Sequence, residues 1–327
     1  MQYTQLGERG PQVSRISFGN WSAGGDWGSV DRAAAIGATR EALDLGITLF
    51  DTARAYGFGA AEELLGEALR PEIGSARESI VIATKGGLRN DGGQPARDSS
   101  PAALRSDLEA SLRSLGTDYV DLYQVHWPDP ATPITQTAET LDAFVREGKV
   151  RFVGVSNYDA RQMTAFQQVR PIDTLQPPYH MFRRDIEGSI LPFAAEHGIG
   201  VLVYGPMAHG LLSGRMNEGT TFAVGDWRAS SDLFVGHAFR QNLAIVRRLE
   251  TVASERGVTV AQLAIAWTLA HPAVDVAIVG ARSPEQIRQT APAAEIDLSQ
   301  DDLAEIHRIL RDEVAVGGPA PEAMPAS

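Results

Sequence analysis

Four side chains suited to proton transfer stand at or just after the carboxyl ends of predicted strands. Asp51, Lys85 and His126 each end a short apolar run, and Tyr56 follows Asp51 by about one helical turn. Tyrosine is a weak acid with a pKa near 10, and a neighbouring ammonium group lowers that pKa and eases proton release. The set therefore predicts general acid catalysis, in which Tyr56 donates the proton and Lys85 supplies positive charge held in place by Asp51.

His126 extends this chemistry to the reduction of a carbonyl group. An imidazole can donate a hydrogen bond to a carbonyl oxygen, which becomes negative as hydride reaches the carbon atom. Alone, Asp51 can be a turn cap and Lys85 a solvated loop charge. Alone, His126 can be a structural donor and Tyr56 a packing residue. These structural explanations do not account for all four residues at the ends of neighbouring strands.

The strands that position these residues are short apolar runs, which is typical of parallel strands covered on both faces. Eight such runs alternate with helical segments, and this order predicts a single-domain (β/α)8 (TIM) barrel over residues 1–327. In such barrels the active site lies at the carboxyl ends of the strands, where the four residues stand. The predicted strands are 15–18, 48–51, 80–85, 119–126, 150–156, 174–176, 201–204 and 276–280.

Three additions to a minimal barrel are predicted, followed by a Gly-, Pro- and Ala-rich tail over about 313–327 that is either disordered or draped over the barrel. The first is an N-terminal β-hairpin that plugs the lower end and whose second arm can run on into the first barrel strand. The additions are the hairpin over 3–6 and 12–14, an insertion between strands seven and eight with a loop over 207–236 and helices over 237–256 and 260–269, and a C-terminal extra helix over 299–310.

Composition narrows the function classes. The 327 residues include no cysteine, which excludes disulfides and thiolate chemistry, and the net charge of −12 argues against binding nucleic acid over a broad surface. No run approaches the roughly 18 apolar residues of a membrane span, and the N-terminus lacks a signal-peptide pattern. We therefore expect a cytoplasmic monomer whose partner is a small molecule.

Several motifs, in order along nearly the whole chain, resemble the aldo-keto reductase family. The wording of the middle and C-terminal motifs is most similar to the bacterial branch that includes general stress protein 69 and the inositol-locus reductases. The resemblance implies a catalytic tetrad of Asp51, Tyr56, Lys85 and His126, as the chemistry predicts, and NADP(H)-dependent reduction of aldehydes or ketones. The matching segments are 50–57 with Glu62-Glu63, 82–85, 118–128, 154–158 and 175–179.

The same resemblance implies how the cofactor is held. Ser156, Asn157 and Gln176 are expected to bind the nicotinamide carboxamide, and Tyr204 to stack on the ring. Arg215 is the expected pyrophosphate contact, with Arg228 as a second cation that could instead pair with a nearby acid. The 2′-phosphate is expected at 280–283 with Gln286. The remaining implied contacts are Gly19, Asn20, Trp21, Asp51, Gly205, Pro206, Met207, Gly210, Leu211, Gly280, Ala281, Arg282 and Thr290.

Aromatic residues around the expected carbonyl site suggest substrates with apolar bodies. The predicted substrate contacts are Trp21, Tyr56, His126 and Trp127, and alternatively the tryptophans only pack the barrel rim. Trp27 and His209 are weaker candidates. The sequence leaves aromatic aldehydes, sugars and polyols open as substrates.

Two rival functions remain open. One is an NADP-binding redox-sensing subunit without turnover, which the complete tetrad disfavours. The other is a metal-dependent barrel hydrolase or isomerase, which needs several His or carboxylate ligands at strand ends. Asp51 and His126 are the only clear candidates for such ligands, and Lys85 comes between them along the chain. We therefore expect no metal site.

Overall fold

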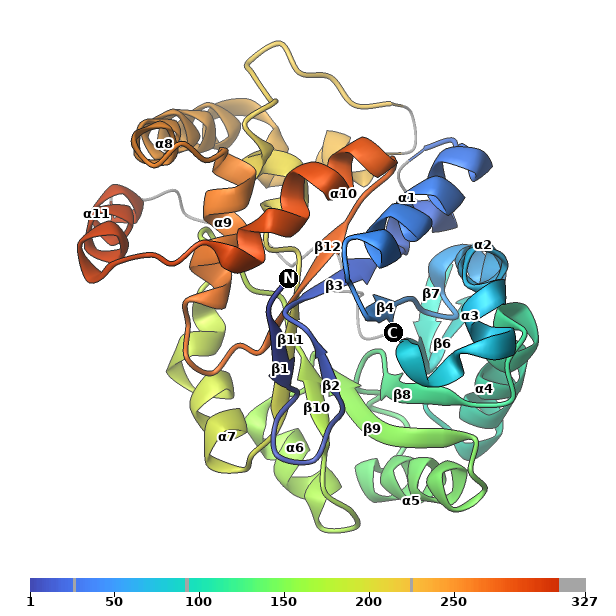
Figure 1. Cartoon of the computed structure of the whole chain (residues 1–327). Helices are drawn as coiled ribbons and strands as arrows, with labels where there is room; N and C mark the ends of the chain where they lie inside the picture. Colours follow the sequence, from blue (N-terminus) through green and yellow to red (C-terminus); the bar gives the residue numbers. More distant parts are fainter. Residues whose placement is uncertain (26–27, 92–93, 224–225, 312–327) are drawn as a thin grey trace.

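Eight parallel strands close into a barrel at the centre of the protein (Figure 1). The computed structural model describes residues 1–25, 28–91, 94–223 and 226–311. The final barrel strand pairs with the first, so the sheet has no open edge, and the predicted fold class is confirmed. Every strand end lies within one residue of its prediction. The strands are β3 (Ile16–Gly19), β4 (Leu49–Asp51), β5 (Val81–Gly86), β8 (Val120–Val125), β9 (Val150–Ser156), β10 (Thr174–Gln176), β11 (Gly200–Tyr204) and β12 (Val276–Gly280).

Helices surround the barrel, and local signals set their ends (Figure 1). Ser100 accepts a hydrogen bond from the Ala103 N–H at the start of α4, Pro101 is its first residue, and Gly116 ends it with a φ of 68°. The helices are α1 (Arg32–Asp44), α2 (Ala60–Ala68), α3 (Arg70–Ser75), α4 (Pro101–Leu115), α5 (Ile134–Arg146), α6 (Ala160–Gln167), α7 (Ile190–Glu196), α8 (Gly236–Glu255), α9 (Val260–Leu269), α10 (Pro284–Thr290) and α11 (Gln300–Leu310).

Short 3₁₀ helices fill several loops between these elements. Among them, η2 carries Tyr56, and η5 follows the seventh barrel strand. They are η1 (Trp21–Gly24), η2 (Tyr56–Gly59), η3 (Arg77–Ser79), η4 (Asp185–Gly188), η5 (Ala208–Ser213), η6 (Trp227–Ser230), η7 (Asp232–Phe234) and η8 (Ala291–Glu295).

The N-terminal hairpin of β1 (Tyr3–Gln5) and β2 (Gln12–Ser14) plugs the barrel, as predicted. Leu6 and Val13 are fully buried and pack with the inward-facing apolar side chains of the barrel strands. Gly7 has a φ of 64°, and a Cβ there would lie 2.3 Å from the Gly200 nitrogen, so this turn requires glycine. A bend at Arg15 separates β2 from β3, so the second arm does not run on into the barrel.

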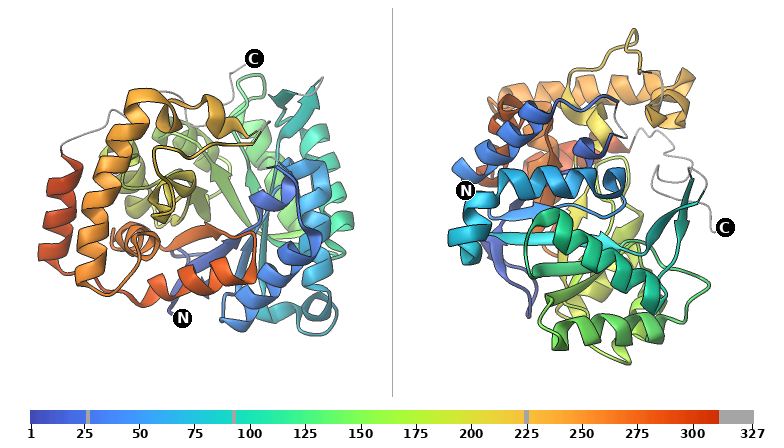
Figure 2. Two further views of the ribbon diagram at one scale, coloured as in Figure 1. Left: turned by 90° about the horizontal axis from the view of Figure 1, so that it is seen from above. Right: turned by 90° about the vertical axis from the view of Figure 1, so that its right-hand side faces the viewer.

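The insertion before β12 contains η5 to η7 followed by α8 and α9, in agreement with the predicted loop and two helices. The C-terminal helix α11 lies beside α8 (Figure 2, left). One element was not predicted: a hairpin of β6 (Leu88–Asp91) and β7 (Gln94–Arg97), which projects from the barrel (Figure 2, right). The predicted tail over 313–327 lies outside the described residues. Among the described helices, none is long and apolar enough to cross a membrane.

Carboxylates at the amino ends of alternate barrel strands bind the backbone of the preceding strand. Each of these side chains satisfies a backbone N–H group of the neighbouring strand. Arginines near each carboxylate balance its charge. The bonds run from Ile82 N–H to Asp121 (2.9 Å), from Val153 N–H to Asp173 (2.8 Å) and from Val201 N–H to Asp275 (2.8 Å).

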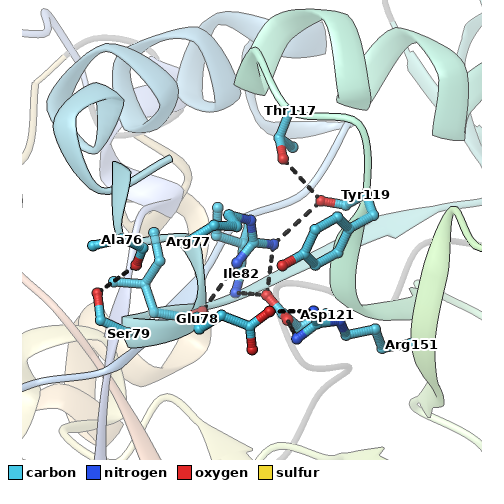
Figure 3. Close-up of polar contacts among 10 residues, drawn as sticks. Ala76, Arg77, Glu78, Ser79, Ile82, Thr117, Tyr119, Asp121 and Arg151 are labelled. Atoms are coloured by element: carbon cyan, nitrogen blue, oxygen red, sulfur yellow. Dashed lines mark hydrogen bonds and ion pairs between the residues drawn. The ribbon is translucent and has the colours of Figure 1, made fainter. Parts of the chain in front are cut away.

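Asp121 has the most extensive of these networks (Figure 3). Arg77 donates to its carboxylate at 2.7 Å and Arg151 at 3.3 Å. Both guanidinium groups also lie over the Tyr119 ring, 4.2 and 4.3 Å from its centre. The buried carboxylate therefore joins β5, β8, β9 and the segment before β5 at the lower end of the barrel.

Replacement of Asp121 should strongly destabilise the fold. Asp121→Asn removes the charge that Arg77 and Arg151 face and places an amide group opposite their donors. Loss of one partner of a buried ion pair costs about 3 kcal/mol or more, to be measured by urea denaturation. Glu78→Gln is the matched control, because Glu78 also pairs with Arg151 but is mostly exposed. Equal denaturation midpoints for the two variants would contradict this role of Asp121.

Candidate active site

The buried ammonium group of Lys85 holds the predicted acid and its neighbours together. Lys85 Nζ lies 2.6 Å from Asp51 Oδ1, 2.8 Å from the Thr52 carbonyl oxygen and 3.4 Å from the Tyr56 hydroxyl. An ammonium group has three N–H donors and no acceptor, so these three contacts use all of its donors. The Tyr56 oxygen must act as the acceptor from Lys85, and its own proton is directed elsewhere.

Local folding accounts for this convergence. Asp51 ends β4, and Lys85 is the fifth residue of the neighbouring strand β5, so both point into the top of the barrel. Tyr56 begins η2, which returns over the strand ends. Burial lowers the pKa of Lys85, and the attraction of Asp51 acts in the opposite direction. The result is a positive charge beside a phenol, with little solvent to screen it.

His126 presents an uncharged imidazole to the same point. Its ring meets the Tyr56 ring edge-on, with centroids 5.7 Å apart. Burial, and secondarily the charge of Lys85, hold the pKa of His126 well below its usual range. The neutral ring keeps one N–H donor, which suits hydrogen bonding to a carbonyl oxygen. The predicted tetrad is thus brought together in space.

The predicted nicotinamide contacts form one hydrogen-bonded group. Gln176 Nε2 donates to Asp51 Oδ2 at 2.9 Å, and Ser156 Oγ donates to the Gln176 carbonyl oxygen at 2.8 Å. Asn157 has a φ of 61°; it donates to the His126 carbonyl oxygen and accepts from the Tyr204 hydroxyl at 2.9 Å. This left-handed residue therefore links the strand end of His126 to Tyr204, the predicted stacking residue.

The segment after Tyr204 has several left-handed residues. Ala208 and His209 have φ values of 47° and 55°, and both are non-glycine residues. Arg215 is exposed and donates to Gln289 at 2.6 Å. Arg228 pairs with Asp226 at 2.6 Å, which is the alternative that the sequence left open for it. The remaining predicted positions there are Gly205, Pro206, Met207, Gly210 and Leu211, of which Pro206 and Leu211 are buried.

After β12, the predicted 2′-phosphate segment lies at the surface. Gly280 and Arg282 are exposed, Ala281 is buried, and Gly280 pairs with Gly19 of β3. The Arg282 N–H donates to Gln286 Oε1 at 2.7 Å, and its guanidinium donates to the Ser29 carbonyl oxygen at 2.9 Å. This contact ties the segment after β12 to the loop that precedes α1.

Two predicted cofactor residues use their side chains within the protein. Asn20 is buried and donates to the Ala61 carbonyl oxygen of α2 at 2.7 Å. Thr290 is buried and donates to the Gln286 carbonyl oxygen in its own helix at 3.0 Å. Both side chains therefore support local structure in this conformation.

Aromatic rings extend from the acid toward the insertion. Trp21 stacks on Tyr56 with centroids 6.1 Å apart, and the His209 ring meets Trp21 edge-on at 6.2 Å. Trp227, which the sequence reasoning did not select, continues the row 5.0 Å from His209. Trp127 instead lies under the guanidinium of Arg97 in β7, at 5.0 Å. Trp27 lies outside the described residues.

A buried carboxylate, Glu62, lies behind the tetrad; the sequence reasoning named it within a motif but assigned it no role. The Glu62 side chain is fully buried. Its spacing with Leu65 and Leu69, both fully buried, places a carboxylate on the apolar face of a helix. That pattern is visible in the sequence and marks a buried charge with a partner. Among the residues that the structure describes, no group of three or more His, Asp or Glu side chains could hold a metal ion.

Comparisons with known proteins identify the family of the chain. The model of the aldo/keto reductase family matches residues 15–311. Aldo-keto reductase YhdN of Bacillus subtilis (strain 168) is 41% identical over 317 residues, which cover 96% of this chain and 95% of the relative. The NADH-specific methylglyoxal reductase of Escherichia coli (strain K12) is 33% identical, with 92% and 96% covered.

Structural similarity extends over the same length. The solved structure of the glycerol dehydrogenase AKR11B4 from Gluconobacter oxydans matches with a TM-score of 0.88 and 36% identity, covering 98% of each chain. The chain therefore belongs to the aldo/keto reductase family.

The imidazole of His209 should make stability depend on pH. Burial, then the charges of Arg183 and Arg228, lower the pKa of His209 to about 3. The unfolded chain takes up that proton below about pH 6.5, so this contribution to stability is complete above that pH and is lost as the pH falls. His209→Asn tolerates the left-handed backbone and should flatten the decline by about 1.4 kcal/mol per pH unit between about pH 6 and pH 4. Parallel stability curves for wild type and variant would refute this assignment.

Proposed function

We propose that this chain is an NADP(H)-dependent oxidoreductase that reduces aldehydes or ketones to alcohols, with Tyr56 as the proton donor. The observation that carries the proposal is the set of three contacts of Lys85 Nζ, to Asp51, to the Thr52 carbonyl oxygen and to the Tyr56 hydroxyl. They hold a positive charge against a phenol oxygen, whose proton is thereby directed away from Lys85.

The proposed mechanism assigns a separate task to each residue. The bound nicotinamide cofactor would supply the hydride. Tyr56 donates its proton to the substrate oxygen as negative charge develops there, and Lys85 stabilises the phenolate that results. Asp51 keeps Lys85 charged and oriented. His126, held neutral, donates a hydrogen bond to the same substrate oxygen and orients the carbonyl group.

The residues present are suited to a nicotinamide dinucleotide. Ser156, Asn157 and Gln176 offer amide and hydroxyl groups beside the tetrad, which match the donors and acceptors of a carboxamide. Arg215 and Arg282 add cations farther along, in a chain of net charge −12, where an extended polyphosphate needs them. Arg228 would have to exchange Asp226 for a phosphate to take part.

The proposal also covers the class of substrate and the branch of the aldo/keto reductase family to which the chain belongs. Trp21 beside Tyr56 favours a carbonyl compound with an apolar body. The amino-acid sequence of the motifs favours the bacterial branch that includes general stress protein 69 and the inositol-locus reductases. The identity shared with the Bacillus subtilis relative is compatible with that placement.

Tyr56→Phe should abolish most of the activity. The variant keeps the ring but cannot donate a proton, so turnover should fall by about 10²-fold or more while NADPH binding stays nearly unchanged. Steady-state NADPH oxidation with a panel of reactive aldehydes measures turnover, and fluorescence titration measures binding. Wild-type turnover in the variant, with chemistry rate-limiting, would remove Tyr56 from the mechanism. Tight NADPH binding without turnover in the wild-type protein would favour the redox-sensing subunit instead.

The cofactor preference should depend on Arg282. A 2′-phosphate needs a cation, and Arg282 is an exposed cation directly after β12, so NADPH should bind more tightly than NADH. Arg282→Ala should reduce that preference by about tenfold, corresponding to one charge-assisted contact. Arg288→Ala is the matched control, since Arg288 is exposed on α10 but pairs with Glu41 and Glu285. Equal wild-type affinities for the two cofactors would refute the NADP assignment. A preference for NADH, as in the relative named as NADH-specific, would refute it as well.

A further inference from the structure

A buried polar cluster lies behind the strand that carries Lys85, on the side facing the helices. Its centre is Glu62 in the first turn of α2, whose side chain has no exposed surface. Thr84 Oγ1 donates to Glu62 Oε1 at 2.7 Å. Thr84 directly precedes Lys85 on β5, and successive strand side chains point to opposite faces. Glu62 and Asp51 therefore approach the same strand from its two faces.

Arg54 joins this cluster to the loop of the predicted acid. It lies between Asp51 and Tyr56 in the sequence, and its N–H donates to the Lys85 carbonyl oxygen at 3.0 Å. Its Nη1 lies 3.6 Å from Glu62 Oε2. A Cβ built on Gly59 would come within 2.0 Å of the same Nη1, so the arginine side chain runs against the end of η2. The loop is thus fixed at its backbone and at its side chain.

We infer that Glu62 and Arg54 are positioning residues for the Lys85–Tyr56 pair: Arg54 fixes the loop that bears Tyr56, and Glu62 adds a second negative charge to the surroundings of Lys85. The inference rests on the proposed function, because its main readout is proton donation by Tyr56. Neither residue touches the substrate oxygen in the proposed mechanism.

The charges around Lys85 and Tyr56 determine in which direction Glu62 and Arg54 change the ionisation of the pair. Lys85 faces Asp51 from β4 and Glu62 from α2, and both favour its charged form. Burial raises the pKa of Glu62, whereas its contacts with Thr84 and Arg54 act in the opposite direction. The negative charge of Glu62, which lies 3.6 Å from the Arg54 guanidinium, disfavours the phenolate form of Tyr56.

Other titratable groups also face the cluster, and they do not reverse the effect of Glu62 on the phenolate. Asp107 of α4 accepts the Gly87 N–H at 2.9 Å and interacts with the charge of Arg54. Tyr123 of β8 is fully buried beside Glu62 and Asp107, and burial raises its pKa well above the usual range. His126, which faces Tyr56 from the end of β8, is neutral. Glu62 and Arg54 are therefore the charges whose removal changes the balance behind Lys85.

The test is the pH dependence of single-turnover carbonyl reduction with NADPH already bound. Glu62→Gln keeps the size of the side chain and an acceptor for Thr84 but removes the negative charge. The alkaline decline in rate should therefore move to lower pH, by about half a pH unit. Arg54→Met removes the opposite charge, so its decline should move to higher pH, and its plateau rate should fall about tenfold as the loop loosens.

Control variants separate the effect of the lost charge from structural disruption caused by the substitution. Glu63→Gln alters the next residue of α2, which is exposed, and should reproduce the wild-type profile. The double variant E62Q with R54M should return the midpoint close to the wild-type value. The dissociation constant for NADPH should change less than about twofold in every variant, because none of these residues is expected to contact the cofactor.

The possible outcomes distinguish failure of this inference from failure of the proposed function. Opposite shifts of the two single variants support the inference, whereas unshifted profiles or shifts in the same direction overturn it. If E62Q does not fold, the direction of the shift in R54M decides alone. An active wild type that Tyr56→Phe inactivates, together with unshifted profiles, overturns only this inference. A wild type without turnover overturns the proposed function and this inference with it.

Discussion

One buried ammonium group constrains the upper end of the barrel. Removing a charged side chain from water is costly unless its partners replace the lost hydration. Lys85 is fully buried, and the chain provides a carboxylate, a backbone carbonyl and a phenol for its three donors. Asp51, Thr52 and Tyr56 all belong to one short stretch that begins at the last residue of β4. That stretch must therefore fold back across the mouth of the barrel, and the position of Tyr56 follows from the need to satisfy Lys85.

The two ends of the barrel use the same kind of group for different purposes. At the lower end, Asp121, Asp173 and Asp275 accept backbone N–H groups of the neighbouring strands and are balanced by arginines. At the upper end, Asp51 also accepts two donors, Lys85 and Gln176, but the positive charge it holds faces a reactive phenol. The carboxylates at the lower end hold the strands in register, whereas Asp51 at the upper end orients a proton donor. This division agrees with the general placement of function at the carboxyl ends of barrel strands.

Sequence patterns predict most of this architecture because barrel strands are short, doubly covered and bounded by strong turn signals. They also bring the tetrad to one place, since strand ends in a parallel barrel must share an edge. The β6–β7 hairpin was missed because its strands are polar and lack an apolar alternation. Trp21 and His209 were named as substrate candidates, but Trp227, which continues their row, was missed because its place depends on how the long insertion folds back. Side-chain partners such as Asp226 for Arg228 depend on rotamers, which periodicity does not specify.

Barrel closure also has a consequence for synthesis of the chain. β3 pairs with β12, so residues at positions 16–19 bond to residues at positions 277–280, and the N-terminal amine reaches Glu295. Contacts of such long sequence separation form late because loop closure must precede them. A nascent chain on the ribosome cannot complete its barrel until almost all of it has emerged. Until then one edge of β3 has no partner, and unpaired strand edges of this kind are where partly folded chains aggregate.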